Sequence, residues 1–193
     1  MELIQALANR MADYVVKRDK TANQEVLSYG LSLVLMAIAS YATVLASAII
    51  FGLVKEMLIA IGTFILMRTT VGGCHANNRV ACLATYTGLL YASILLAGVI
   101  ILNMYATIIL YLFNIVLLVL YAPGDTVEQP MVQYRFLRKI YGLFFITLLF
   151  AFALFVPNMR AETNILLFVS TFVSILLHPM IYKLYGCRRS SNK

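Results

Sequence analysis

The chain contains few charged residues. They make up 12% of its 193 residues, whereas hydrophobic residues make up 62%, and the mean hydropathy is +0.89. A typical soluble domain is about 25% charged and 45–50% apolar. The shortage of charge therefore excludes a soluble domain and predicts an integral membrane protein that is solvated by lipid.

Cysteine is scarce as well, with three residues in the whole chain, Cys74, Cys82 and Cys187. The number is odd, and the charge pattern below places segment ends near two of them inside the cell, where thiols stay reduced. We therefore expect no disulfide framework. A metal site is not expected either, because His75, Cys74 and Cys82 lack a fourth ligand and a familiar zinc spacing. Nothing in the sequence indicates a cofactor.

Acidic residues are also few, eight against fifteen basic ones, which gives a net charge of +7. Basic loops beside anionic lipid are the expected state of a membrane protein. The positive charge is therefore explained without nucleic acid as a partner.

The apolar runs predict an all-α, polytopic membrane protein with six transmembrane helices. A span needs roughly 20 apolar residues. The six are expected over 29–54, over 57–67, twice within the charge-free stretch 80–124, over 140–156 and over 164–182. Asn103 predicts a tight turn between the third and fourth helices. The second run reaches only about 17 Å and must recruit flanking residues.

The basic residues set the predicted orientation, because lysine and arginine collect in cytoplasmic loops. Six spans with both termini in the cytoplasm put all but two of the fifteen basic residues inside, the exceptions being Lys55 and Arg160. We expect a single membrane domain over 1–193 in the cell membrane. It comprises an N-terminal segment over 1–26, the six helices within 27–186 and a basic cytoplasmic tail over 187–193.

The N-terminal segment is too polar for a signal sequence. Apolar residues recur in it at helical spacing, and polar residues take the other side. The apolar set is Leu3, Ile4, Leu7, Met11, Tyr14 and Val15. This pattern predicts an amphipathic helix that lies on the inner leaflet. It serves either to anchor the chain to the membrane or to dock an amphipathic peptide.

One polar cluster interrupts the apolar sequence and contains the residues suited to nucleophilic chemistry. It combines a glycine pair, a histidine, a cysteine seven residues later and two arginines, namely Gly72, Gly73, His75, Cys82, Arg68 and Arg79. In one straight helix His75 and Cys82 would be about 10.5 Å apart, too far for proton transfer. The glycines allow the chain to bend between them.

The third helix would then begin just after the bend. Asn77 or Asn78 can cap it, which leaves Cys82 in its first turns. There the helix N-terminus and Arg79 favour the thiolate form. From the residues alone, a cysteine nucleophile competes with a small transporter built on broken helices or a structural membrane subunit. Cys74 is a rival nucleophile, and Cys187 is either an apolar filler or an acylation site. His178-Pro179 predicts a kink with a hydrogen-bonded histidine.

Two motifs in order give the chain a resemblance to a known family. The first is Arg68 followed by Gly72-Gly73-Cys74-His75-Ala76 and Cys82. The second is Ala122-Pro123-Gly124-Asp125-Thr126 with Gln129-Pro130, followed by Arg138-Lys139. In these and in its length the chain resembles the accessory gene regulator protein B family. It departs from the family at Gln129, where a lysine is common, and at Cys74, a position that varies.

The resemblance implies a membrane cysteine endopeptidase of peptide quorum sensing that processes the precursor of an autoinducing peptide. It implies Cys82 as nucleophile and His75 as general base, and it implies no third member. Asn77 or Asn78 is a candidate to orient the imidazole. The implied substrate is an amphipathic precursor peptide with a central cysteine and an acidic C-terminal tail. The resemblance also implies a homodimer.

Basic residues are candidates for binding the acidic tail. They are Arg68, Arg79, Arg135, Arg138 and Lys139, and Gly72, Gly73 and Asn77 are further candidates for contact with the substrate. The alternative is that the basic residues only orient the chain in the membrane.

Overall fold

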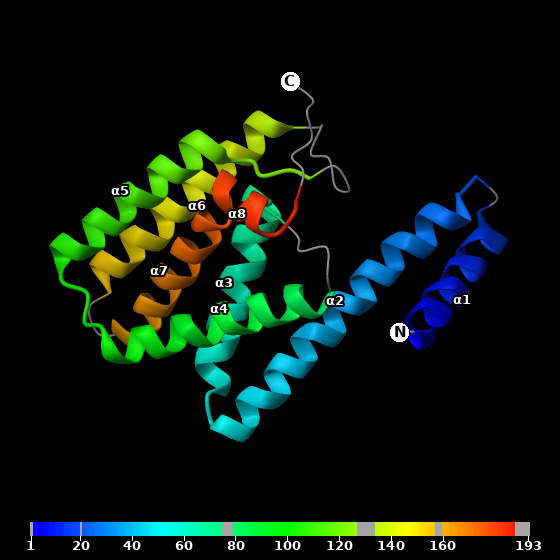
Figure 1. Cartoon of the computed structure of the whole chain (residues 1–193), viewed down its shortest axis with the longest axis horizontal. Coiled ribbons are helices and arrows are strands. Elements are labelled where there is room, and N and C mark those ends of the chain that lie inside the picture. The colour runs from blue at the N-terminus through cyan, green and yellow to red at the C-terminus, as the bar shows by residue number, and fades with distance from the viewer. Residues whose placement is uncertain (1, 20, 75–78, 127–133, 157–159, 188–193) are drawn as a thin grey trace. The chain divides into compact units, whose positions relative to one another are not determined.

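A computed structural model describes residues 2–19, 21–74, 79–126, 134–156 and 160–187 (Figure 1). These residues form eight α-helices, and no strand occurs among them. The all-α prediction is confirmed. Four of the helices are long and apolar enough to cross a membrane, over Gln24–Phe51, Cys82–Val99, Met104–Tyr121 and Arg135–Phe155. Several such helices in one chain indicate a multi-pass membrane protein.

The first of two compact units covers residues 1–52 and contains α1 (Glu2–Arg18) and α2 (Gln24–Phe51). The Asn23 side chain caps α2 by accepting hydrogen bonds from the backbone N–H groups of Glu25 and Val26. Gly52, at φ 70°, ends the helix in the left-handed conformation that glycine adopts without strain. The first predicted span is therefore confirmed as a helix, which begins five residues earlier than the apolar run.

The face of α1 that packs on α2 is small and polar. Ala8 and Ala12 are fully buried, and the side chains of Gln5 and Asn9 hydrogen-bond to Ser28 on α2. The larger apolar side chains remain exposed, among them Leu7, Met11, Tyr14 and Val15. The predicted amphipathic helix thus exists, and its apolar stripe is available to lipid or to a peptide.

The second unit covers residues 53–193 and is built around α7 (Arg160–Ile175). This helix packs against four others, α3 (Val54–Val71), α4 (Arg79–Val99), α5 (Met104–Tyr121) and α6 (Arg135–Phe155). Its buried side chains include small polar ones, Thr163, Ser170, Thr171 and Ser174. Small residues let helix backbones approach closely in a membrane, which suits α7 to the central position.

The predicted helices over 57–67 and 80–124 match this unit well. The helix α3 has 18 residues, because it recruits Lys55, Glu56 and Arg68 with their neighbours, and so reaches about 27 Å. The stretch 80–124 folds into α4 and α5. Asn103 caps α5 by accepting a hydrogen bond from the N–H of Ala106 (2.8 Å), so the predicted turn is confirmed.

The last predicted helix, over 164–182, is broken in the structure. The helix α7 ends at Ile175, and a separate short helix, α8 (Pro179–Leu184), follows a turn. Proline fits the first helical position, where no N–H is needed. His178 caps α8 by accepting a hydrogen bond from the N–H of Met180 (3.3 Å). The hydrogen bond of His178 is confirmed. The predicted kink is instead a complete break between α7 and α8.

Candidate catalytic site

The two sequence motifs meet through their backbones. The N–H of Gly73 donates to the carbonyl of Gly124 (2.9 Å), and the N–H of Gly124 donates to the carbonyl of Val71 (2.8 Å). The loop after α3 (residues 72–74) therefore runs parallel to the loop after α5 (residues 122–126). Segments about 50 positions apart in the sequence become one structural element beside the candidate site.

Glycine is required on both sides of this pairing. Gly72 and Gly73 have φ values of 72° and 130°, which other residues rarely adopt. A Cβ atom added at Gly124 would lie 2.8 Å from the Cα of Gly73 and 2.6 Å from the hydroxyl oxygen of Tyr182. The two loops can approach so closely only without side chains.

The side chain of Arg68 stabilises the loop after α3. Its guanidinium donates hydrogen bonds to the carbonyls of Gly72 (3.0 Å) and Cys74. A planar guanidinium can bridge two acceptors in this way, whereas a lysine ammonium is a single compact charge. Sequence reasoning placed Arg68 among residues that bind substrate, but in the structure its donors face the protein backbone.

The second loop contains an acidic residue that sequence reasoning missed as a site residue. Asp125 is buried, and its carboxylate pairs with the guanidinium of Arg135 at the start of α6. Burial of an unpaired carboxylate would be costly, so this pair explains how Asp125 tolerates its position. The detectable signal in the sequence was an acid directly after the charge-free stretch 80–124, ten residues before an arginine.

Arg138 and Lys139 follow on α6. Lys139 donates a hydrogen bond from its ammonium to the carbonyl of Val119 on α5. Two of the basic candidates on α6, Arg135 and Lys139, therefore also interact with the protein itself.

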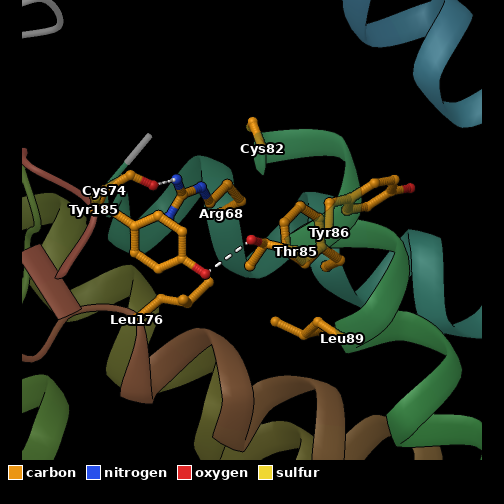
Figure 2. Close-up of a pocket in the computed structure, with 9 residues that line it drawn as sticks. Arg68, Cys74, Cys82, Thr85, Tyr86, Leu89, Leu176 and Tyr185 are labelled. Carbon is orange, nitrogen blue, oxygen red and sulfur yellow. Dashed lines mark hydrogen bonds between the residues drawn. The ribbon is translucent and has the colours of Figure 1, made fainter. Parts of the chain in front are cut away.

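Cys82 lies in the first turn of α4, as expected from a helix that begins near residue 79. It is partly exposed and has a free thiol. It borders a cavity with mainly apolar walls, together with Phe64, Arg68, Cys74, Thr85, Tyr86, Leu89, Leu176 and Tyr185 (Figure 2). The loop that leads to His75 and the helix that carries Cys82 thus form two walls of one cavity.

The expectation that the cysteines are unpaired was wrong. Cys74 and Cys187 form a disulfide, with their Cα atoms 6.1 Å apart. Arguments from the number of cysteines and from the compartment could not reveal this pair, because only the fold brings together two residues 113 positions apart. Cys74 has no free thiol in this state, which leaves Cys82 as the unpaired cysteine.

Other predicted residues lie outside the part that can be described. His75, Asn77 and Asn78 fall outside the described residues, and Arg79 is described only by its backbone, which begins α4. Across the described ranges, no group of three or more potential ligands could hold a metal ion.

Comparison with known proteins identifies the family. The sequence model of accessory gene regulator B matches residues 8–180. The chain belongs to this family. An AgrB-like protein of Clostridium acetobutylicum is 29% identical over 164 residues, which cover 84% of this chain and 78% of that protein. An AgrB-like protein of Listeria innocua is 27% identical over 190 residues, covering 92% and 90%. No solved structure gives a significant match.

Membership of the accessory gene regulator B family implies a role in processing the peptide of a quorum-sensing system. Both motifs that meet at the Gly73–Gly124 pairing lie within the matched residues.

We expect Gly124→Ala to separate the two loops, because the new methyl group would collide with the backbone of Gly73. Overpacking of this kind costs about 1–3 kcal/mol, so the melting temperature of the purified protein in detergent should fall. Gly88→Ala in α4 is the matched control, since nothing lies within 4 Å of the added atom. Equal melting temperatures for the two variants would contradict this account of the loops.

Proposed function

We propose that the protein is a membrane cysteine endopeptidase with Cys82 as its nucleophile and His75 as the general base. The observation that carries the proposal is the position of Cys82. It is the unpaired cysteine, it begins a helix, and it shares a cavity with the loop that directly precedes His75. Family membership supplies the substrate class, the precursor of an autoinducing peptide.

The proposed reaction begins when His75 takes the proton of the Cys82 thiol. The thiolate attacks a peptide carbonyl of the precursor, the C–N bond breaks, and the C-terminal fragment leaves as an amine that accepts the proton from His75. The product is a thioester between the precursor and Cys82. The walls of the cavity are mainly apolar, and exclusion of water when the precursor fills it would protect this thioester from hydrolysis.

A cysteine within the bound precursor then captures the acyl group. One thioester is exchanged for another, so the step involves little change in free energy. Because the attacking thiol and the carbonyl are held in one complex, the reaction is effectively intramolecular. It closes a peptide thiolactone and restores the free thiol of Cys82.

The proposed topology has six spans in the bacterial cell membrane, with both termini and the catalytic site on the cytoplasmic side. It counts α3 and α7 as spans beside the four longer apolar helices, and it follows from the placement of lysine and arginine. The exposed apolar stripe of α1 supports an interfacial position for that helix, where it could also bind the amphipathic leader of the precursor.

Substitution of either reacting residue should abolish cleavage. The purified protein in liposomes, given a synthetic precursor, should cleave it and form a thioester at Cys82 that mass spectrometry detects and hydroxylamine releases. We expect Cys82→Ala and His75→Ala to lose both signals, whereas Cys74→Ala retains cleavage. Cleavage by Cys82→Ala at the wild-type rate would contradict the proposal, and solute flux that survives this change would favour a transporter.

Arg68→Lys separates a role in the loop from a role in binding substrate. The lysine retains the positive charge but cannot bridge the carbonyls of Gly72 and Cys74. A hydrogen bond from a charged group contributes about 1.5–3 kcal/mol, so we expect kcat to fall roughly tenfold or more while KM changes little. Steady-state kinetics check this. Wild-type kcat in Arg68→Lys, with loss only in Arg68→Glu, would instead show that the charge alone matters.

Arg79 and Arg138 remain candidates for binding the acidic tail. We expect Arg79→Glu to lower the cleavage rate more than Lys193→Glu, a charge reversal of the same size in the C-terminal tail. The measurement is the initial rate at matched protein levels. If both reversals reduce it equally, Arg79 has no specific role in recognition.

A further inference from the structure

The segment that ends the described chain touches both halves of the candidate site. This segment, residues 179–187, comprises α8 and the three residues after it, and we call it the C-terminal strap. Its last residue, Cys187, is bonded to Cys74 in the loop that leads to His75. Two residues earlier, the hydroxyl of Tyr185 hydrogen-bonds to that of Thr85 (2.8 Å), on the helix that carries Cys82. Figure 2 shows Tyr185 reaching Thr85 across the cavity, with Cys74 beside it.

The C-terminal strap is itself well ordered by local interactions. The N–H of Cys187 donates to the carbonyl of Tyr182 (2.8 Å), and Gly186, at φ 66°, makes the turn that this bond requires. Tyr182 is only 3% exposed. An anchored segment of this kind can fix the positions of what it contacts, which a flexible tail cannot do.

The second loop also meets the strap. A Cβ atom at Gly124 would come within 2.6 Å of the Tyr182 hydroxyl oxygen, so Tyr182 packs against the backbone that pairs with Gly73. Three elements of the site therefore contact the C-terminal strap, which has nine residues. They are the Cys74 loop, the loop after α5 and the first turns of α4.

We propose that the C-terminal strap positions the Cys74 loop, residues 72–74, relative to Cys82, and that its disulfide makes this positioning reversible by oxidation and reduction. Cys187 and Tyr185 are the positioning residues, one through a covalent bond to Cys74 and the other through a hydrogen bond to Thr85. The inference rests on the proposed function and deepens it, because it adds redox control to the same site.

The redox step is a two-electron exchange of the two thiols. A hydroperoxide oxidises Cys74 and Cys187 to the disulfide, and their two hydrogens leave in the alcohol and water that form. A dithiol reductant of the thioredoxin type returns two hydrogens to the sulfur atoms and becomes a disulfide itself. In the reducing cytoplasm, disulfides are usually transient and serve in catalysis or redox sensing. A reversible disulfide on the cytoplasmic side of the proposed topology fits this pattern.

The state with the Cys74–Cys187 disulfide formed is the more active one. With the disulfide formed, the residue directly before His75 is fixed to the strap, and the strap is fixed to the helix of Cys82. Reduction breaks the covalent bond between the loop and the strap and leaves the hydrogen bonds of the loop to Arg68 and Gly124. The productive arrangement becomes less populated. We expect kcat to fall about three- to tenfold with little change in KM, since a small misplacement of reacting groups is costly.

The experiment compares oxidised and reduced wild-type protein in liposomes with the synthetic precursor. Reduction uses a phosphine that is removed before the assay, because a thiol reductant would attack the thioester. Labelling of the denatured protein with a maleimide counts free thiols. We expect one in the oxidised and three in the reduced protein, with kcat three- to tenfold higher in the former and restored on reoxidation by peroxide.

Variants separate positioning from a merely structural role. Cys74→Ser, Cys187→Ser and the double variant should all have the kcat of reduced wild-type protein and should not respond to the phosphine. Tyr185→Phe should lower kcat in both redox states with KM unchanged. Tyr105→Phe, which alters an exposed tyrosine on α5, is the control and should have no effect.

The outcomes distinguish this inference from the proposed function. If wild-type protein cleaves the precursor equally well with one or three free thiols, the disulfide does not control activity. The proposed protease function would be unaffected by that result. Three free thiols after peroxide treatment would also overturn the redox inference. If wild-type protein cleaves in neither state, the proposed function fails and the positioning role fails with it.

Discussion

Two backbone hydrogen bonds between the loop after α3 and the loop after α5 are the constraint on which the rest of the site depends. They join Val71 and Gly73 to Gly124 at distances that leave no room for a side chain. This pairing turns the chain sharply at the end of α3. The proposed reaction requires a bend of this kind, because in one continuous helix His75 and Cys82 would be too far apart for proton transfer.

The charged groups near the site largely serve the protein itself. Arg68 bridges two carbonyls of the first loop, and Arg135 pairs with the buried Asp125 in the second. In an apolar setting unsatisfied polar groups are costly, so irregular loops at the membrane boundary need such partners. The guanidinium groups of Arg68 and Arg135 therefore have a structural role as partners of loop groups.

Much of the fold could be predicted from the sequence, because helices in a membrane protein correspond to long apolar runs. Asn103 marked the turn between α4 and α5 correctly, since an asparagine within a charge-free stretch is a natural helix cap. The break before Pro179 was underestimated, because the apolar residues around it continue through the turn. The length of α3 exceeded its apolar run, since its charged ends are helical too.

The site could be predicted only in part. Motif spacing indicated Cys82 at a helix start, and α4 begins where that reading requires. The bond between Cys74 and Cys187 and the pairing with Gly124 depend on contacts between distant segments, which neither spacing nor composition contains. Arg68 appeared to be a free charge because its partners are backbone carbonyls, which any residue supplies. Local pattern thus identifies the reactive residue types, while the tertiary fold decides their partners.

The proposed reaction requires the imidazole of His75 and the thiol of Cys82 to meet. Cross-linking tests it most directly, in membranes that contain the variant His75→Cys in a background of Cys74→Ser and Cys187→Ser. The account predicts that a mild oxidant or a very short thiol-specific linker joins position 75 rapidly to Cys82, as shown by mass spectrometry of the linked peptides. Failure of the two positions to cross-link, while both thiols react readily with a maleimide, would contradict it.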